Sequence, residues 1–320
     1  MDNKGKMISY YGSEDTELLS YLEFGSIDIK NAKKTVWGYW QHQEAYDLYM
    51  FARYARDLFL FRDFYYEKQK SILKLREYIN RTAHDKIIDY VFKYVGFLTL
   101  LSNENLEKSV CESGSSLFGL IEEVIATDYV FSEGKNIEKI KKLKYLGSDI
   151  SKMMNRGAKE FHPDIKFAFS MADTIDKLMD EYQRIGLFYG LSISLRYALR
   201  QAKDIQKIAE NSDIVIFNRI SLSYEKTLKI EAGTGKYAYI ISIDELKECL
   251  RSGGMYAKFT TDNMQKNKDG DNTIRVSMII TKHENLFNDF IKFYDNCVEK
   301  LIEEKIEGIE HGEWKDIEEL

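Results

Sequence analysis

Short apolar runs alternate with helical patterns along much of this chain, and this alternation constrains its fold more than any other feature. Runs with the length and composition of strands occur at residues 108–112, 144–149, 165–170, 185–190 and 213–218. Helical patterns follow several of them, at 120–126, 174–183 and 192–201. Strands that alternate with helices predict a mostly parallel sheet with helices on both faces.

The pattern changes towards the end of the chain. Residues 243–252 predict a helix that stops at a following pair of glycines. Two late strands, at 256–261 and 273–281, are expected to form an antiparallel pair. Residues 288–305 predict a closing helix, and the Lys- and Glu-rich stretch 299–320 is expected to be a solvated helix and chain end.

The beginning of the chain carries helical rather than strand patterns. Residues 38–66 show apolar side chains every three or four positions, and residues 85–101 predict a second apolar helix. We therefore divide the chain into a helical N-terminal region at 1–105, a sheet domain at 106–285 and a C-terminal helix and tail at 286–320. The N-terminal region is expected to cap a substrate site or to mediate dimerisation.

Composition narrows the classes of function. The net charge of −6 disfavours nucleic acid as a partner, because phosphate binding needs a basic face. No run of about 18 apolar residues is present, so no transmembrane helix is expected, and the N-terminus lacks the apolar core of a signal peptide. The three cysteines are widely spaced and match no metal-binding pattern. A reducing cytoplasm, no disulfide framework and no bound metal are therefore expected.

The first predicted strand ends in an acid and a glycine-bearing turn. Glu112 closes the run 108–112, and Gly114 and Gly119 lie in the turn before the helix at 120–126. Such a turn must be tight and must let the backbone approach a ligand closely, which favours glycine. Strand, glycine-bearing turn and helix together are typical of the opening unit of nucleotide-binding α/β folds.

This order of elements resembles the class I S-adenosyl-methionine-dependent methyltransferases over roughly residues 106–285. Those enzymes have a Rossmann-like α/β sheet of seven strands, in which the last hairpin makes one strand antiparallel. The resemblance implies the same seven-stranded sheet here, preceded by the helical N-terminal region. It also implies S-adenosyl-methionine as cofactor and S-adenosyl-homocysteine as product.

By this resemblance, the turn after the first strand packs against the methionine part of the cofactor. The residues that it assigns to this contact are Glu112, Gly114, Ser115 and Gly119. Tyr189 lies at the end of the fourth strand and is therefore expected near the reactive methyl group.

The resemblance also assigns the adenosine part of the cofactor. Asp149 ends the second strand, where the family places an acid that hydrogen-bonds both ribose hydroxyls. Ile150 is then expected to flank the adenine, and Asp173, after the third strand, to bind its amino group. Charge-assisted hydrogen bonds of this kind are about twice as strong as neutral ones. The alternative for Glu112, Asp149 and Asp173 is a solvated position in a loop.

The chain departs from the family pattern in two places. Ser116 stands where the turn usually has its second glycine. Residues 113–148 separate Glu112 from Asp149, which is longer than the roughly 20 residues common in dinucleotide-binding folds. We therefore interpret residues 127–143 as an insertion.

A narrower similarity is to sugar O-methyltransferases, and it rests on the stretches ESGSSLFGLIE, FYGLSISLRYAL, SDIVIFNRISLS and GTGKYAYIIS. It implies a small-molecule acceptor, preferably a sugar or a sugar-containing metabolite. Two alternatives stay open: an N-methyltransferase of a specialised metabolite, and a catalytically degenerate protein that binds a nucleotide or mediates assembly. The expected partners are a small-molecule acceptor and a second copy of the chain, with neither nucleic acid nor a membrane.

A sugar hydroxyl needs a general base as its proton leaves, and the sequence offers few candidates. His42 lies in an aromatic segment that could cap a substrate pocket, and its alternative is a partly buried structural histidine. Asn218 and Arg219 end the fifth strand, at the edge where open α/β sheets bind ligands. Arg219 could hold an anionic substrate group bidentately, or it could form an ion pair with a neighbouring helix.

The stretch Gly233–Lys236, GTGK, invites a phosphate-loop interpretation. That motif needs a glycine five positions before its second glycine and a Ser or Thr after the lysine. Ile230 and Tyr237 occupy those positions, so we reject the phosphate loop. A loop that touches the substrate is the expectation that replaces it.

Overall fold

The computed structural model describes residues 72, 76, 87–113, 119–148, 166–168, 184–191, 199–231, 237–266, 272–306 and 309–320. Its helices are α5 (Ile87–Ser102), α6 (Gly119–Ser132), α7 (Ile137–Ile140), α11 (Ala202–Glu210), α12 (Ile243–Ser252) and α13 (Glu284–Glu303), with a 3₁₀ helix at Ile317–Glu319. Its strands are β1 (Ser109–Ser113), β2 (Lys144–Ser148), β3 (Lys166–Ala168), β4 (Ile185–Leu191), β5 (Ser212–Ser223), β6 (Leu228–Glu231), β7 (Tyr237–Ser242), β8 (Tyr256–Lys266), β9 (Thr273–Thr281) and β10 (Trp314–Asp316). None of these described helices is long and apolar enough to cross a membrane.

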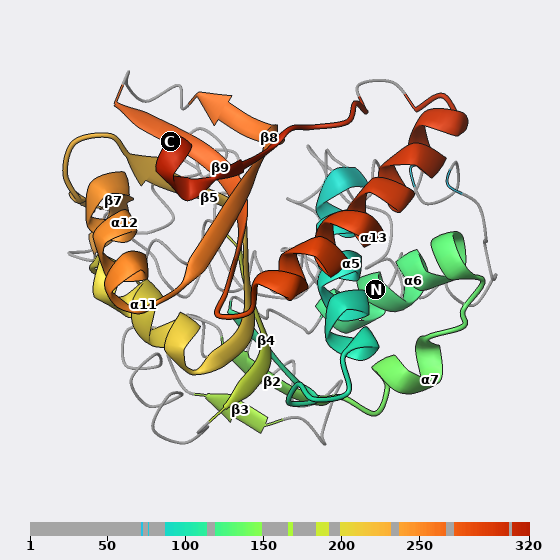
Figure 1. Cartoon of the computed structure of the whole chain (residues 1–320). Helices are drawn as coiled ribbons and strands as arrows, with labels where there is room; N and C mark the ends of the chain where they lie inside the picture. Colours follow the sequence, from blue (N-terminus) through green and yellow to red (C-terminus); the bar gives the residue numbers. More distant parts are fainter. Residues whose placement is uncertain are drawn as a thin grey trace, which may run out of the picture.

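The strands form a sheet with the order β10-β8-β9-β5-β4-β1-β2-β3 (Figure 1). The strands from β5 to β3 along this path run parallel, whereas β9 is antiparallel to both of its neighbours, β5 and β8. The predicted parallel centre and the predicted antiparallel pair at the end are therefore confirmed. The described sheet has 10 strands rather than the seven expected, because β6, β7 and β10 add to the predicted set.

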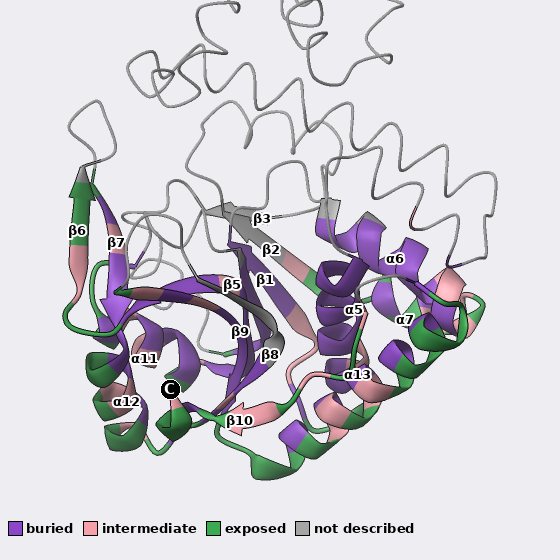
Figure 2. Ribbon diagram, turned by 90° about the horizontal axis from the view of Figure 1, so that it is seen from above, coloured by how far each residue is buried: buried purple, intermediate pink, exposed green. Residues whose placement is uncertain are grey.

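Helices cover both faces of the sheet, as the alternation of the sequence predicts (Figures 1 and 2). α5, α6 and α13 pack on one face, and α11 and α12 pack on the other. Along β5, Ile214 and Ile216 belong to the first core cluster, and Val215 and Phe217 belong to the second. Successive residues of a strand point to opposite faces, so a strand buried on both sides becomes a continuous apolar run.

The helix bounds explain the long spacing between the first two strands. α6 continues well past the predicted 120–126 and is followed by the short helix α7. The segment 127–143, which we interpreted as an insertion, therefore holds the end of one helix and all of the next. Asp128 fixes this region, since its buried carboxylate accepts hydrogen bonds from the Tyr94 hydroxyl and from the backbone and side chain of Asn136.

The predicted helices on the second face of the sheet agree with the structure only in part. α12 begins and ends where the sequence predicts, with Gly253 as its C-cap. α11 lies immediately after the helix predicted at 192–201, and it begins at a capping box of Gln201 and Asp204. Residues 192–198 and the helix predicted at 174–183 lie outside the described residues.

The end of the chain is not the solvated tail that its charged composition suggests. β10 pairs antiparallel with the edge strand β8, and Trp314 lies opposite Thr260. The Trp314 indole packs against three rings, with centroid distances of 6.0 Å to Phe92, 5.7 Å to Phe290 and 5.4 Å to Tyr294. Aromatic contacts of this kind stabilise a fold by more than the burial of their apolar area alone. The packing of Trp314 therefore holds β10 on the sheet, although the charged residues around it do not suggest a strand.

Helix α5 lies directly on the sheet. A Cβ placed on Gly96 would lie 2.5 Å from Cδ1 of Ile216, which shows how closely the helix backbone approaches β5. α5 also packs beside α13, and both helices belong to the same core cluster as the strands. The proposed division at 1–105, 106–285 and 286–320 stays a prediction, with one helix from each outer part packed on the central sheet.

Candidate functional site

The carboxyl ends of the central strands lie side by side at one edge of the sheet. Ser113 at the end of β1 pairs with Ser148 at the end of β2 and with Gly190 near the end of β4. Leu191 of β4 pairs with Asn218 of β5. Open α/β sheets bind ligands outside these ends, so the predicted location of the site agrees with the observed register.

Glu112 and Tyr189 are in-register partners on β1 and β4. Two residues earlier on their strands, Val110 and Leu187 belong to the core cluster under α5 and α6, so Glu112 and Tyr189 point to that same face. Both side chains are buried. Burial raises the pKa of Tyr189, against the opposing effect of the Lys93 ammonium, so its hydroxyl stays protonated and can donate a hydrogen bond.

A β-bulge reshapes the end of β5. The register with β9 shifts between Phe217 and Ile220, and Arg219 there has a positive φ of 57°. Ser277 of β9 holds the bulge, because its hydroxyl accepts from the Arg219 N–H at 3.1 Å and donates to Oδ1 of Asn218 at 2.8 Å. A positive φ is rare for a residue with a side chain, and such conformations gather at functional sites.

The bulge directs Arg219 towards the first turn of α5. Nη2 of Arg219 lies 3.0 Å from Oδ2 of Asp89, and the two side chains are 23% and 12% exposed. The ion pair with a neighbouring helix, one of the two alternatives for Arg219, is thus confirmed. A partly exposed ion pair at a ligand-binding edge can still contact a substrate, since a guanidinium has five N–H donors.

A second, more deeply buried ion pair lies beside Tyr189. Nζ of Lys93 on α5 is 2.5 Å from Oε2 of Glu123 on α6, and the ammonium lies 5.8 Å from the Tyr189 ring centroid and 5.1 Å from that of Tyr90. Burial acts to lower the pKa of Lys93, but Glu123 and other neighbouring groups outweigh it and raise that pKa above its usual value. Lys93 is therefore charged within the fold.

The sequence analysis missed Asp89, Lys93 and Glu123. A signal for them does exist: Asp89 and Lys93 lie in the largely apolar segment that forms α5, and Glu123 lies among apolar residues in α6. Buried charges are almost always paired, so the charged residues of two largely apolar helices could have suggested a contact between those helices.

The structure brings together part of the predicted site. Glu112, Tyr189, Asn218 and Arg219 lie at one sheet edge, and Asn218 donates weakly to the Tyr189 hydroxyl at 3.4 Å. Gly119 is the first residue of α6. The remaining predicted residues lie outside the described part of the chain: His42, Gly114, Ser115, Asp149, Ile150 and Asp173. Of these, Asp149 follows Ser148, the last residue of β2, in the sequence.

The rejection of a phosphate loop agrees with the local structure. A phosphate loop joins a strand to a helix, whereas the GTGK stretch joins the antiparallel strands β6 and β7. Its residues 233–236 lie outside the described residues.

Neither a known family model nor a curated protein matches this chain. Solved structures that resemble it share little sequence identity. For an S-adenosylmethionine-dependent methyltransferase from Clostridium acetobutylicum the identity is 13%, the match covers 64% of this chain and 99% of that one, and the TM-score is 0.37. Magnesium protoporphyrin IX methyltransferase from Synechocystis is 15% identical, and its match covers 80% of this chain and 99% of that one with a TM-score of 0.36.

The match to the bifunctional kinase-methyltransferase WbdD has 14% identity and a TM-score of 0.36, and it covers 61% of this chain. The chain spans only 39% of the length of WbdD. Strand order and register identify the fold independently of these low scores: the central strands are parallel, β9 is inserted antiparallel between β5 and β8, and helices cover both faces. The described part of the chain therefore has a Rossmann-like α/β fold.

Proposed function

We propose that this protein is an S-adenosyl-methionine-dependent methyltransferase that acts on a hydroxyl of a small molecule, preferably a sugar or sugar-containing metabolite. One observation carries the proposal. The tips of β1 and β2 are adjacent, parallel and in register, with Glu112 opposite Gly147 and Ser113 opposite Ser148. Acids at or just after these two tips can therefore act on one ligand.

The donor groups at this edge suit the cofactor. Glu112 is a buried carboxylate at the tip of β1, and Asp149 immediately follows the tip of β2 in the sequence. Carboxylates bind ammonium and hydroxyl groups, which are the polar groups of the methionine and ribose parts. α6 is the helix that follows β1 in the chain, so the unpaired backbone N–H groups of its first turn are further candidate donors at this edge. When bound, S-adenosyl-methionine supplies an electrophilic methyl group.

The acceptor side of the proposed site is polar. Tyr189 offers a protonated hydroxyl, Asn218 an amide, and the Asp89–Arg219 pair a carboxylate and a guanidinium. Such groups match a hydroxyl-rich acceptor, because each buried polar group of the acceptor needs a hydrogen-bond partner. Orientation of the acceptor hydroxyl towards the methyl group would lower the barrier by up to roughly 7–11 kcal/mol in ideal cases.

Asp89 is our candidate for the group that accepts the hydroxyl proton. Its carboxylate lies at the ligand-binding edge and retains partial exposure beside Arg219. A carboxylate within hydrogen-bond reach of the acceptor hydroxyl can accept its proton. An amine acceptor would depend less on this group, because a neutral amine needs no base to become a nucleophile.

Asp89→Asn is expected to lower kcat on a hydroxyl acceptor by about 100-fold, the lower range for loss of a general base. Production of S-adenosyl-homocysteine would be followed with a panel of sugar nucleotides and a panel of amines. Affinity for S-adenosyl-homocysteine should stay unchanged in this variant. The matched control is Asp244→Asn, which alters an exposed acid in the first turn of α12. Turnover of amines alone would favour the N-methyltransferase alternative, and full activity of Asp89→Asn would place the base elsewhere.

A further inference from the structure

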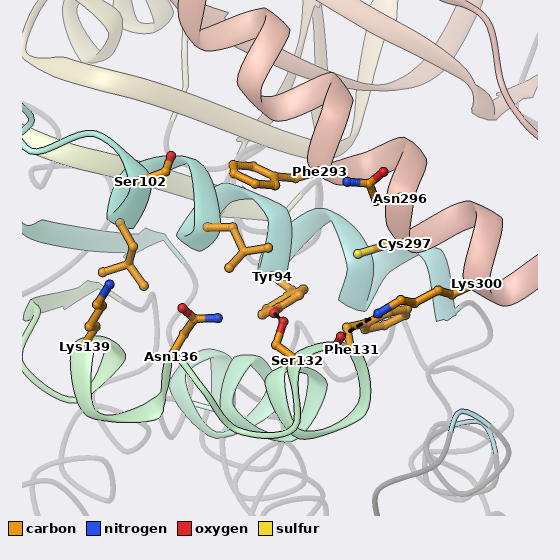
Figure 3. A pocket seen from close by; sticks show the side chains of 12 residues that line it. Tyr94, Ser102, Phe131, Ser132, Asn136, Lys139, Phe293, Asn296, Cys297 and Lys300 are labelled. Atoms are coloured by element: carbon orange, nitrogen blue, oxygen red, sulfur yellow. Dashed lines mark hydrogen bonds between the residues drawn. The ribbon is translucent and has the colours of Figure 1, made fainter.

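A cavity of about 370 Å³ opens on the outer side of the helix layer formed by α5, α6, α7 and α13 (Figure 3). This volume lies within the range of about 300–1,000 Å³ that is common for small-molecule sites. Apolar side chains form much of its wall, among them Leu98 of α5, Phe131 of α6 and Phe293 of α13. Among the described residues, the lining also includes two lysines, Lys139 and Lys300, and no carboxylate.

The cavity is separate from the proposed methyl-transfer site. Asp89 lies in the first turn of α5, whereas the cavity lies along the second half of the helix, around Leu98 and Ser102. At 1.5 Å per residue, Leu98 is about 14 Å further along the helix axis than Asp89. This inference therefore does not depend on the methyltransferase proposal.

Hydrogen bonds and ring packing hold the cavity wall in place. The Tyr94 hydroxyl donates to Oδ1 of Asp128 at 2.8 Å and lies 2.6 Å from Oγ of Ser132. Its ring stacks on Phe131, with centroids 6.0 Å apart and an interplanar angle of 20°. Asn136 is tied to the same Asp128 through its backbone and side chain. A wall fixed in this way loses little conformational entropy when a ligand binds.

Lys139, one of the two lysines that line the cavity, lies in a lysine-rich segment. Residues 135–144 contain five lysines and one glutamate, in a chain whose net charge is −6. Lys139, which lies at this end in Figure 3, has no carboxylate within ion-pair distance among the described residues. The pKa of nearby Lys108 is lowered, mainly by burial and in part by the charge of Lys139. Lys108 does not line the cavity, and its Nζ already donates to the backbone oxygens of Leu100 and Asn103, so an anion at this end would be stabilised by Lys139.

Lys300, the other lysine that lines the cavity, already forms a hydrogen bond within the protein. Nζ of Lys300 donates to the backbone oxygen of Phe131 at 2.7 Å and lies at the opposite end of the cavity from Lys139 (Figure 3). The charged group of a ligand would thus bind at the Lys139 end. Its apolar part would extend between the side chains of Leu98, Phe131 and Phe293.

We propose that this cavity binds a small amphipathic carboxylate, with the carboxylate at Lys139 and a linear apolar body along the wall made by α5, α6 and α13. The combination of apolar side chains along the wall with the ammonium of Lys139 at one end fits this class of ligand. A neutral molecule of the same shape lacks the ionic contact, and a short carboxylate lacks the apolar contact.

The test is a calorimetric titration of the full chain with octanoate, octanol and acetate. Octanoate is expected to bind at one saturable site, more tightly than octanol, and acetate is expected not to bind. Lys139→Gln should weaken octanoate binding by about fivefold, as expected for loss of a partly solvated ion pair, and leave octanol binding unchanged.

The matched control is Lys141→Gln, which removes the same charge from a lysine of the same segment that pairs with Glu138 and does not line the cavity. This variant should bind octanoate as the unaltered chain does. Phe293→Ala should weaken octanoate and octanol alike, because it shortens the apolar wall. Equal affinity for octanoate and octanol, no saturable binding of octanoate, or equal effects of Lys139→Gln and Lys141→Gln would each overturn the proposal.

Discussion

Lys93→Met is expected to lower the free energy of unfolding by about 3–5 kcal/mol. The substitution preserves the length of the side chain but removes the ammonium that lies 2.5 Å from the Glu123 carboxylate. The side chains of Lys93 and Glu123 are only 5% and 11% exposed, so water cannot replace the lost partner of Glu123. Urea denaturation followed by circular dichroism would measure the change.

The control is the double variant Lys93→Met/Glu123→Met. Replacement of both members of a buried ion pair by apolar residues is often neutral or stabilising, so the double variant should recover most of the lost stability. If Lys93→Met alone proves as stable as the unaltered chain, the ion pair does not contribute as the structure implies. If the double variant is as unstable as the single one, the loss comes from packing rather than from the unpaired charge.

Gly186→Ala is expected to cost about 3 kcal/mol or more, because no rotation of a side chain can relieve the clash. A Cβ at this position would lie 1.7 Å from the backbone oxygen of Glu107 and 2.8 Å from Cδ1 of Leu100. The strand β4 and the segment before β1 would have to move apart. A thermal melt of the variant would record this as a strongly lowered Tm or as failure to fold.

Gly253→Ala provides the comparison. The closest atom to a Cβ at Gly253 is the side-chain nitrogen of Gln206 at 3.2 Å, and this flexible group can move. Its cost should therefore be well below that of Gly186→Ala. Similar melting curves for the two variants would contradict the close approach of Glu107 to β4.

The sequence predicts much of the sheet because buried strands and amphipathic helices differ in period. β4, β9 and α12 are found within one residue of their predicted bounds, and the order of parallel strands follows from their alternation with helices. Glu112 could be predicted because it ends an apolar run, which places it at the ligand-binding edge.

Features that depend on contacts between distant segments could not be predicted in this way. The bulge at Arg219 depends on the Ser277 hydroxyl, which lies on a strand far along the chain. The Lys93–Glu123 pair joins two helices whose relative position is a property of the fold. β10 is a short strand of polar composition, and its place in the sheet depends on the packing of Trp314 rather than on any periodicity.

The most direct test of the central claim is a calorimetric titration of the full chain with S-adenosyl-homocysteine. The account predicts saturable binding at one site, and a loss of about tenfold to a hundredfold in affinity for both Glu112→Gln and Asp149→Ala, as expected for a charged hydrogen-bonding group. The exposed acid variant Asp244→Ala should bind as the unaltered chain does. No binding by the unaltered chain, or binding that neither Glu112→Gln nor Asp149→Ala weakens, would contradict a cofactor site between the tips of β1 and β2.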